Sequence, residues 1–135
     1  MLEETAHLDI AFFDVDSCDV VWHGNYVKYL EIARCKLLDR IGYNYRDMRE
    51  SGYFFPIVDL HIKYVKPLLF QQKISVTATL KEWEYRLKIS YLIRDTQTQV
   101  KLTKATTIQA AVDMSKQELM LECPAILVQK VQQAL

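Results

Sequence analysis

The feature that most constrains this chain is one change in the spacing of its apolar residues. Over 25–41 they recur every three to four positions, whereas from 58 onward they alternate with polar residues. The first spacing lines one face of a helix, and the second lines one face of a strand. A lone amphipathic helix must bury its apolar stripe against another layer. We therefore predict an α+β fold in which an antiparallel sheet wraps around one long central helix.

The predicted helix begins at Asn25 and ends before Gly42. A glycine just past the last turn is a common stop, because it adopts the left-handed conformation without strain. Charged residues fall mostly on the side opposite the apolar stripe, as in a helix packed on a sheet. The stripe comprises Tyr26, Leu30, Ala33, Leu37 and Ile41.

Alternation predicts strands on both sides of the helix. One strand is expected before it, four after it, and a terminal helix in the tail from Pro124 to Leu135. In the last strand, Leu102, Ile108, Ala110 and Val112 share one parity and are expected to form its apolar face. The strands are expected over about 7–14, 58–64, 74–80, 87–93 and 100–112, with turns at 82–84 and 95–99.

Composition favours one cytoplasmic domain over residues 1–135. Half of the residues are hydrophobic, and no Gly- or Ser-rich linker divides the chain. The formal net charge is zero, which argues against a general nucleic-acid binder. The three scattered cysteines favour a reducing compartment. No signal peptide is visible, and no apolar run is long enough to predict a membrane span.

The strongest functional signal lies between Phe12 and Arg34, in the stretch FFDVDSCDVVWHGNYVKYLEIAR. It resembles the hotdog-fold thioesterases, specifically the branch like 4-hydroxybenzoyl-CoA thioesterase. That family shows D-x-D, a Val- or Ile-rich pair, His or Tyr, then N-Y and a helix with E-x-A-R, followed later by Y-x-x-P. The matching residues here are Asp14, Asp16, Val20, Val21, His23, Asn25, Tyr26, Glu31, Ala33, Arg34, Tyr64 and Pro67.

This resemblance implies an enzyme that hydrolyses short-chain or aromatic acyl-CoA to free CoA and a carboxylic acid. Asp16 would be the nucleophile or general base, and the His23 side chain would orient water or protonate the leaving thiolate. Backbone N–H groups at the helix start would polarise the thioester carbonyl. Gly24, Asn25 and Tyr26 are the expected substrate-binding residues. The resemblance implies no metal or cofactor, and it implies a homodimer or homotetramer that binds acyl-CoA.

Alternatives remain at two levels. Asp14 is expected to be structural, and Glu31 with Arg34 has the spacing of an ordinary ion pair, with Glu31 as the second candidate for the catalytic carboxylate. The chain could also be a thioesterase for acyl groups on acyl carrier protein, which predicts a basic docking patch, or a non-catalytic module that binds acyl thioesters. Family members usually carry Gly or Ala after the second Asp, where this chain has Ser17, Cys18 and Asp19.

Overall fold

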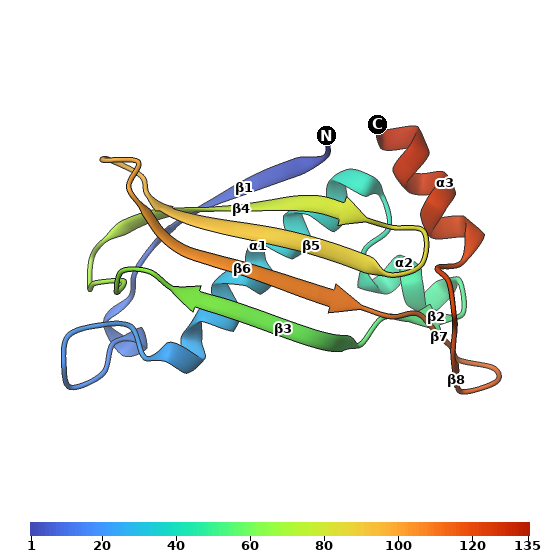
Figure 1. The fold of residues 1–135 in the computed structure, drawn as a ribbon, viewed down its shortest axis with the longest axis horizontal. Helices are drawn as coiled ribbons and strands as arrows, with labels where there is room; N and C mark the ends of the chain where they lie inside the picture. The colour runs from blue at the N-terminus through green and yellow to red at the C-terminus, as the bar shows by residue number, and fades with distance from the viewer.

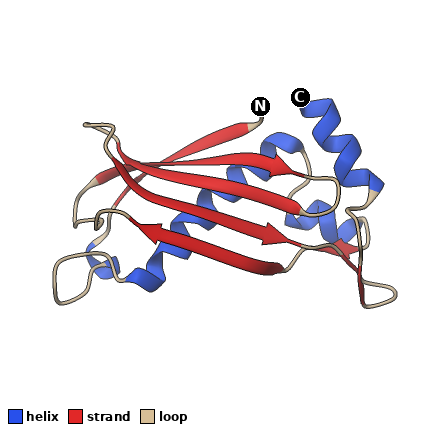
Figure 2. Ribbon diagram, viewed as in Figure 1, coloured by secondary structure: helices blue, strands red, loops and turns tan.

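A long helix crosses the inner face of a five-stranded antiparallel sheet in the computed structural model, which describes residues 1–135 (Figures 1 and 2). The order of the strands is β1-β4-β5-β6-β3, so β1 and β3 form the two edges. The predicted α+β hotdog arrangement is therefore confirmed. The elements are α1 (Tyr26–Ile41), β1 (Glu3–Asp9), β3 (Ile57–Tyr64), β4 (Lys73–Glu82), β5 (Leu87–Asp95) and β6 (Lys101–Gln109).

Helix α1 has the bounds that its local signals predict. Gly42 follows its last residue in the left-handed conformation, with φ of 79°, and its N–H donates to the carbonyls of Leu38 and Asp39. Basic side chains on one flank fasten α1 to the edge of the sheet: Lys36 and Arg40 donate to the backbone carbonyls of Thr5 and Glu3. The helix is thus held at a fixed position relative to β1.

The core lies between α1 and the inner face of the sheet. Apolar side chains at alternate positions of β4 and β5 are buried there, as the alternation predicts. Burying one such side chain stabilises the fold by about 1.5–3 kcal/mol. The fully buried members include Ile74, Val76 and Ala78 of β4 and Leu87, Ile89 and Ile93 of β5.

The first strand lies earlier than expected. β1 covers Glu3–Asp9 rather than 7–14, and Phe12–Asp14 forms a 3-10 turn. The alternation of Leu8, Ile10 and Phe12 was misleading because the chain must leave the sheet to reach the start of α1. Asp14 is buried at the end of this turn, whereas Phe12 is exposed.

The predicted face of β6 is wrong. Its inner, buried residues have the opposite parity and are Thr103, Ala105, Thr107 and Gln109. Two of the polar members find partners: Thr107 is hydrogen-bonded to the hydroxyl of Tyr91 at 2.8 Å, and Gln109 donates to the carbonyl of Phe55 at 2.7 Å. The buried hydroxyl of Thr103 has none. Apolar parity alone does not reveal such long-range partners.

The terminal helix is confirmed as α3 (Ala125–Ala134), directly after Pro124. Short elements were missed at the same end of the molecule. Helix α2 (Tyr45–Glu50) precedes a small sheet of β2 (Tyr53–Phe54), β7 (Val112–Asp113) and β8 (Glu118–Leu119). No helix is long and apolar enough to cross a membrane.

Candidate active site

The segment before α1 folds into a narrow turn that exposes the carboxylate of Asp16. Val15 pairs with Val21, and the backbone N–H of Asp16 donates to the carbonyl of Val20 at 2.9 Å. Asp19 closes the turn with φ of 64°. Aspartate is one of the few residues besides glycine that adopts this conformation readily. The turn therefore forms without the glycine or alanine that the family usually carries.

Asp16 lies at the start of this turn with its side chain exposed. Its Oδ1 accepts the backbone N–H of Cys18 at 2.8 Å, and this is its single side-chain hydrogen bond within the chain. That bond fixes the orientation of the carboxylate, while Oδ2 remains free to contact a ligand or a water molecule. A carboxylate in this state can act as a nucleophile or a base.

Asp14, two residues earlier, is buried and fully engaged. Its carboxylate accepts hydrogen bonds from Lys28 Nζ and from the hydroxyl of Tyr29, the latter at 2.8 Å. Burial raises the pKa of Asp14, but these hydrogen bonds and the charge of Lys28 outweigh burial and hold the pKa below its usual value. Burial and the bond to Asp14 raise the pKa of Tyr29. Asp14 therefore fastens the loop to α1.

His23 and Gly24 form a single 3-10 turn that leads into α1. Among the backbone hydrogen bonds of turns and loops, Asn25 N–H donates to the Trp22 carbonyl at 2.9 Å, whereas none begins at His23 or Gly24. The side chain of His23 is exposed, and its carbonyl accepts the hydroxyl of Tyr64 at 3.0 Å. N–H groups at a helix start attract negative charge.

The other two expected substrate-binding side chains are turned inward. Asn25 Nδ2 donates to the backbone carbonyl of Asp14 at 2.9 Å, so this amide supports the loop. Tyr26 is buried, and its hydroxyl accepts the N–H of Leu68 at 3.3 Å. The side chains of Asp16 and His23 are thus exposed at one end of the molecule, and those of Asn25 and Tyr26 hold this end together.

Gly24 lies directly under the ring of Trp22. A Cβ atom at this position would come within 2.3–2.8 Å of three ring carbons of Trp22, closer than atoms can approach. The Trp22 ring is itself half exposed and lies 5.2 Å from the ring of His23. A side chain at position 24 would therefore have to displace the Trp22 ring.

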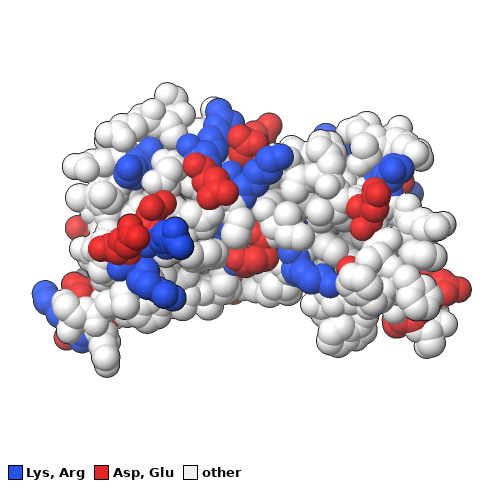
Figure 3. All heavy atoms as spheres, turned by 180° about the vertical axis from the view of Figure 1, so that it is seen from behind, with Lys and Arg blue, Asp and Glu red and all other residues white.

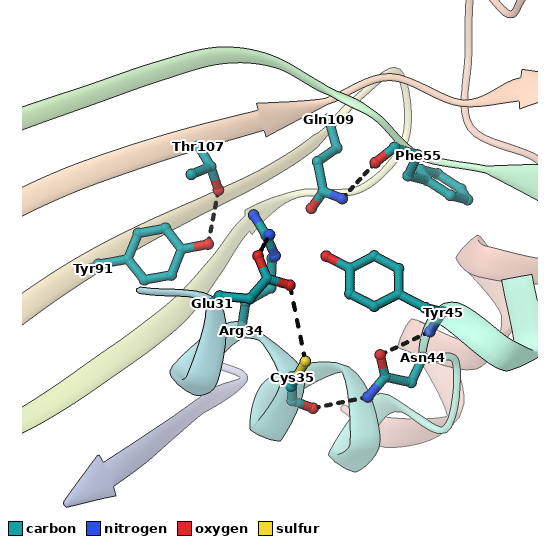
Figure 4. Close-up of polar contacts among 9 residues, drawn as sticks. All are labelled: Glu31, Arg34, Cys35, Asn44, Tyr45, Phe55, Tyr91, Thr107 and Gln109. Atoms are coloured by element: carbon teal, nitrogen blue, oxygen red, sulfur yellow. Dashed lines mark hydrogen bonds and ion pairs between the residues drawn. The ribbon is translucent and has the colours of Figure 1, made fainter. Parts of the chain in front are cut away.

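Farther along α1, Glu31 and Arg34 form the ion pair that their spacing predicts, but it is not a surface pair (Figure 4). Arg34 is only 5% exposed and lies under the sheet, with its guanidinium 6.0 Å from the ring of Tyr45. Its Nε and the Oε1 of the buried Gln109 have no hydrogen-bond partner. Figure 4 shows the Tyr45 hydroxyl pointing toward Gln109. Apart from the partly exposed Glu31, this polar cluster lies inside the fold, whereas Asp16 is at the surface.

Comparison with known proteins places the chain in a family. The sequence model of the thioesterase-like superfamily matches residues 10–134. The chain belongs to this superfamily. It is 27% identical over 107 residues to a Bacillus subtilis protein named "Putative acyl-CoA thioesterase YneP", covering 78% of this chain and 77% of that one.

Solved structures of thioesterases have the same fold as this superfamily member. The DHNA-CoA thioesterase of Staphylococcus aureus superposes with a TM-score of 0.84 at 22% identity, covering 98% of this chain and 93% of that one. The 1,4-dihydroxy-2-naphthoyl-CoA thioesterase of Synechocystis gives a TM-score of 0.84 at 18% identity, with coverages of 98% and 94%.

Three contacts around the site of this thioesterase-like protein were not predicted from the sequence. Lys28 and Tyr29 bind Asp14 across 14 and 15 positions of the chain, and Tyr64 reaches His23 across 41. The helical spacing places Lys28 among the charged residues outside the apolar stripe and Tyr29 next to the stripe, and it does not indicate a contact with Asp14. The signal available in the sequence was a lysine in the first turn of the helix that follows the loop.

Proposed function

We propose that this thioesterase-like protein hydrolyses acyl-CoA to free CoA and a carboxylic acid, with its active site at Asp16 and the start of α1. One observation carries the proposal: a single loop combines an exposed carboxylate with backbone N–H groups that no other part of the chain occupies. The superfamily match and the named relatives support the reaction class.

In the proposed reaction, the N–H groups of His23 and Gly24 bind the thioester oxygen as negative charge develops on it. Asp16 either removes a proton from an attacking water molecule or attacks the carbonyl carbon itself. A carbon–oxygen bond forms, the carbon–sulfur bond breaks, and the electron pair leaves with sulfur. The exposed His23 side chain donates a proton to this thiolate. In the second route, water then hydrolyses the acyl-aspartate anhydride.

The same proposal includes a homodimer, with a homotetramer as the larger assembly. β3 is an edge strand, and residues on its inner face remain exposed beside α1: Leu60 is 41% and Tyr64 is 46% exposed. An unpaired apolar edge favours pairing with a second copy, which would cover these side chains beside the candidate site. Light scattering after size exclusion measures the mass. A protein that is monomeric at micromolar concentration would contradict the proposed homodimer.

The test of the reaction is thiol release from a panel of acyl-CoA substrates, both short-chain and aromatic, followed with a thiol reagent. Release from at least one of them is expected. If every acyl-CoA binds but none is hydrolysed, the chain is a binding module. If the protein hydrolyses acyl groups only when they are attached to acyl carrier protein, the proposed reaction holds but the proposed carrier, CoA, is wrong.

Glu31 is the second candidate for the catalytic carboxylate, because it is partly exposed beside the buried Arg34. The two roles predict different results for Glu31→Gln. A structural role predicts loss of stability by about 3 kcal/mol, since the charge of Arg34 would lose its partner. A catalytic role predicts loss of turnover with little change in the unfolding midpoint. Thermal unfolding and thiol release on the same preparation separate the two.

A further inference from the structure

The outer face of the sheet, opposite α1, carries a group of basic residues without acidic partners. This basic group comprises Lys63, Arg94, Lys101 and Lys104, and none of them takes part in the ion pairs of the chain. The acidic residue closest in sequence, Asp95, is bound by Gln72 and by backbone N–H groups of its own turn. On the helix side, acidic and basic side chains alternate (Figure 3).

The members of the basic group face one another in pairs. Lys63 of β3 is directly opposite Lys104 of β6, and Arg94 of β5 is directly opposite Lys101 of β6. Like charges at such positions destabilise a sheet. In addition, Nε of Arg94 is buried without a hydrogen-bond partner. A chain whose formal net charge is zero thus keeps two repulsive pairs side by side. Local violations of this kind concentrate at functional sites.

A shallow hollow of about 460 Å³, open to solvent, is lined by three members of the basic group: Lys63, Lys101 and Lys104. Its volume falls within the range of small-molecule sites. Ammonium groups and hydroxyl groups both donate hydrogen bonds, which is the chemistry that recognises phosphate. The polar lining comprises His61, Lys63, Ser90, Lys101, Lys104 and Thr106.

The hollow is at the same end of the sheet as the candidate active site. Lys63 precedes Tyr64, whose hydroxyl donates to the carbonyl of His23. In Figure 1, the end of β3 and the loop before α1 lie together at the left. The hollow and the loop are separated by the edge of the sheet. A thioester bound at His23 and Gly24 would therefore have its carrier near this edge, and in CoA the pantetheine arm ends in phosphates.

On the basis of the proposed function, we infer that the hollow binds the nucleotide phosphates of the acyl-CoA substrate. The phosphates neutralise Lys63 and Lys104 and the Lys101 member of the second pair, so binding reduces the repulsion among these side chains. The thioester then extends around the sheet edge to the start of α1. The acidic surface of a carrier protein is the competing occupant.

Direct binding of adenosine 3′,5′-bisphosphate to the intact protein tests the inference without requiring turnover. Isothermal titration should give saturable binding that weakens with added salt. The double variant Lys63→Gln/Lys104→Gln should weaken binding about 10- to 100-fold, since two charge-assisted hydrogen bonds are lost. The matched control Lys81→Gln/Lys116→Gln, which removes two exposed lysines elsewhere, should bind as the wild type does. No binding by the wild type, or equal binding by both double variants, overturns the inference.

The ligand-free stability of the same variants tests the repulsion. Lys63→Gln/Lys104→Gln should unfold at a temperature about 1–4 °C higher than the wild type, because a repulsive cross-strand pair is removed. A lower unfolding temperature would contradict the repulsive pairing on which the inference depends.

Kinetics then distinguish the carriers. With acyl-CoA, the double variant should raise KM about tenfold or more and leave kcat nearly unchanged, because the phosphates bind far from the reacting carbonyl. With an acyl-N-acetylcysteamine thioester, which lacks phosphate, both parameters should match those of the wild type. If the wild type hydrolyses no thioester, the proposed function fails while the titration still decides the hollow. Binding of acyl carrier protein without binding of the bisphosphate would overturn the nucleotide assignment.

Discussion

Asp14 and Asp16 are two residues apart, yet their surroundings differ in almost every respect. Asp14 is buried and receives hydrogen bonds from Lys28 and Tyr29, whereas Asp16 is exposed and receives one from its own turn. A fully engaged carboxylate stabilises the fold but cannot reach a substrate. A carboxylate with a free oxygen contributes little to stability and is available for chemistry. The D-x-D motif therefore combines an anchor with a candidate catalytic group.

The largest effect is expected for Asp16→Asn, which removes the negative charge and keeps the size. Loss of a general base or nucleophile should lower kcat/KM about 100- to 10,000-fold for the best acyl-CoA of the panel. The unfolding midpoint should not change, because the side chain is exposed. Asp19→Asn, in the same turn, is the control and should have a far smaller effect. Wild-type rates in Asp16→Asn would exclude Asp16.

Gly24→Ala should follow, with a decrease of about 10- to 100-fold in kcat. The new methyl group would displace the Trp22 ring, and the backbone N–H groups beside it would shift from the thioester oxygen. The double variant Gly24→Ala/Trp22→Ala should recover part of the rate, since the obstructing ring is gone. Absence of any recovery would show that Trp22 is not the cause.

Asp14→Asn should lower the free energy of unfolding by about 2 kcal/mol at pH 7, because hydrogen bonds to a charged group are lost. The substitution is expected to act on stability and not on the chemical step. Since the pKa of Asp14 is lowered in the folded protein, its charge stabilises the fold above the unfolded pKa of about 3.9. The contribution disappears as pH falls from about 5 through the lowered pKa.

Urea unfolding of wild type and Asp14→Asn at pH 7 and pH 3 measures this difference directly. The difference in the free energy of unfolding between the two proteins should be smaller at pH 3 than at pH 7. An equal difference in the free energy of unfolding at pH 7 and at pH 3 would mean that the charge of Asp14 does not stabilise the fold.

The smallest effect is expected for Tyr29→Phe, which should lower the free energy of unfolding by about 1 kcal/mol. This variant removes one of the two donors to Asp14 and leaves the partly exposed Lys28 in place. Asp14 would then become easier to protonate, so the acid-induced loss of stability should begin at a higher pH. Urea unfolding as a function of pH is the measurement. An unchanged dependence of the unfolding free energy on pH would mean that Lys28 alone lowers the pKa of Asp14.

The sequence predicts the elements whose signals are local. Helix α1 has the expected limits because Gly42 and the apolar stripe lie within the helix or next to it. The inner face of β6 was misassigned because Thr107 and Gln109 are satisfied by Tyr91 and by the carbonyl of Phe55, which lie far away in the chain. The motif identified the loop of the candidate site, but the partners of Asp14 and the pairing of Lys63 with Lys104 depend on tertiary contacts.

Strand β1 pairs only with β4, and the two are joined by contacts such as Thr5 with Thr77, which are 72 residues apart. During synthesis, β1 leaves the ribosome long before its partner exists. Closing such a large loop is slow, because its entropic cost precedes any gain from the pairing. We therefore expect the β4–β5–β6 meander to form first and β1 to add late in refolding. Until then the inner face of β4 and its unpaired edge are accessible to chaperones and to other nascent chains.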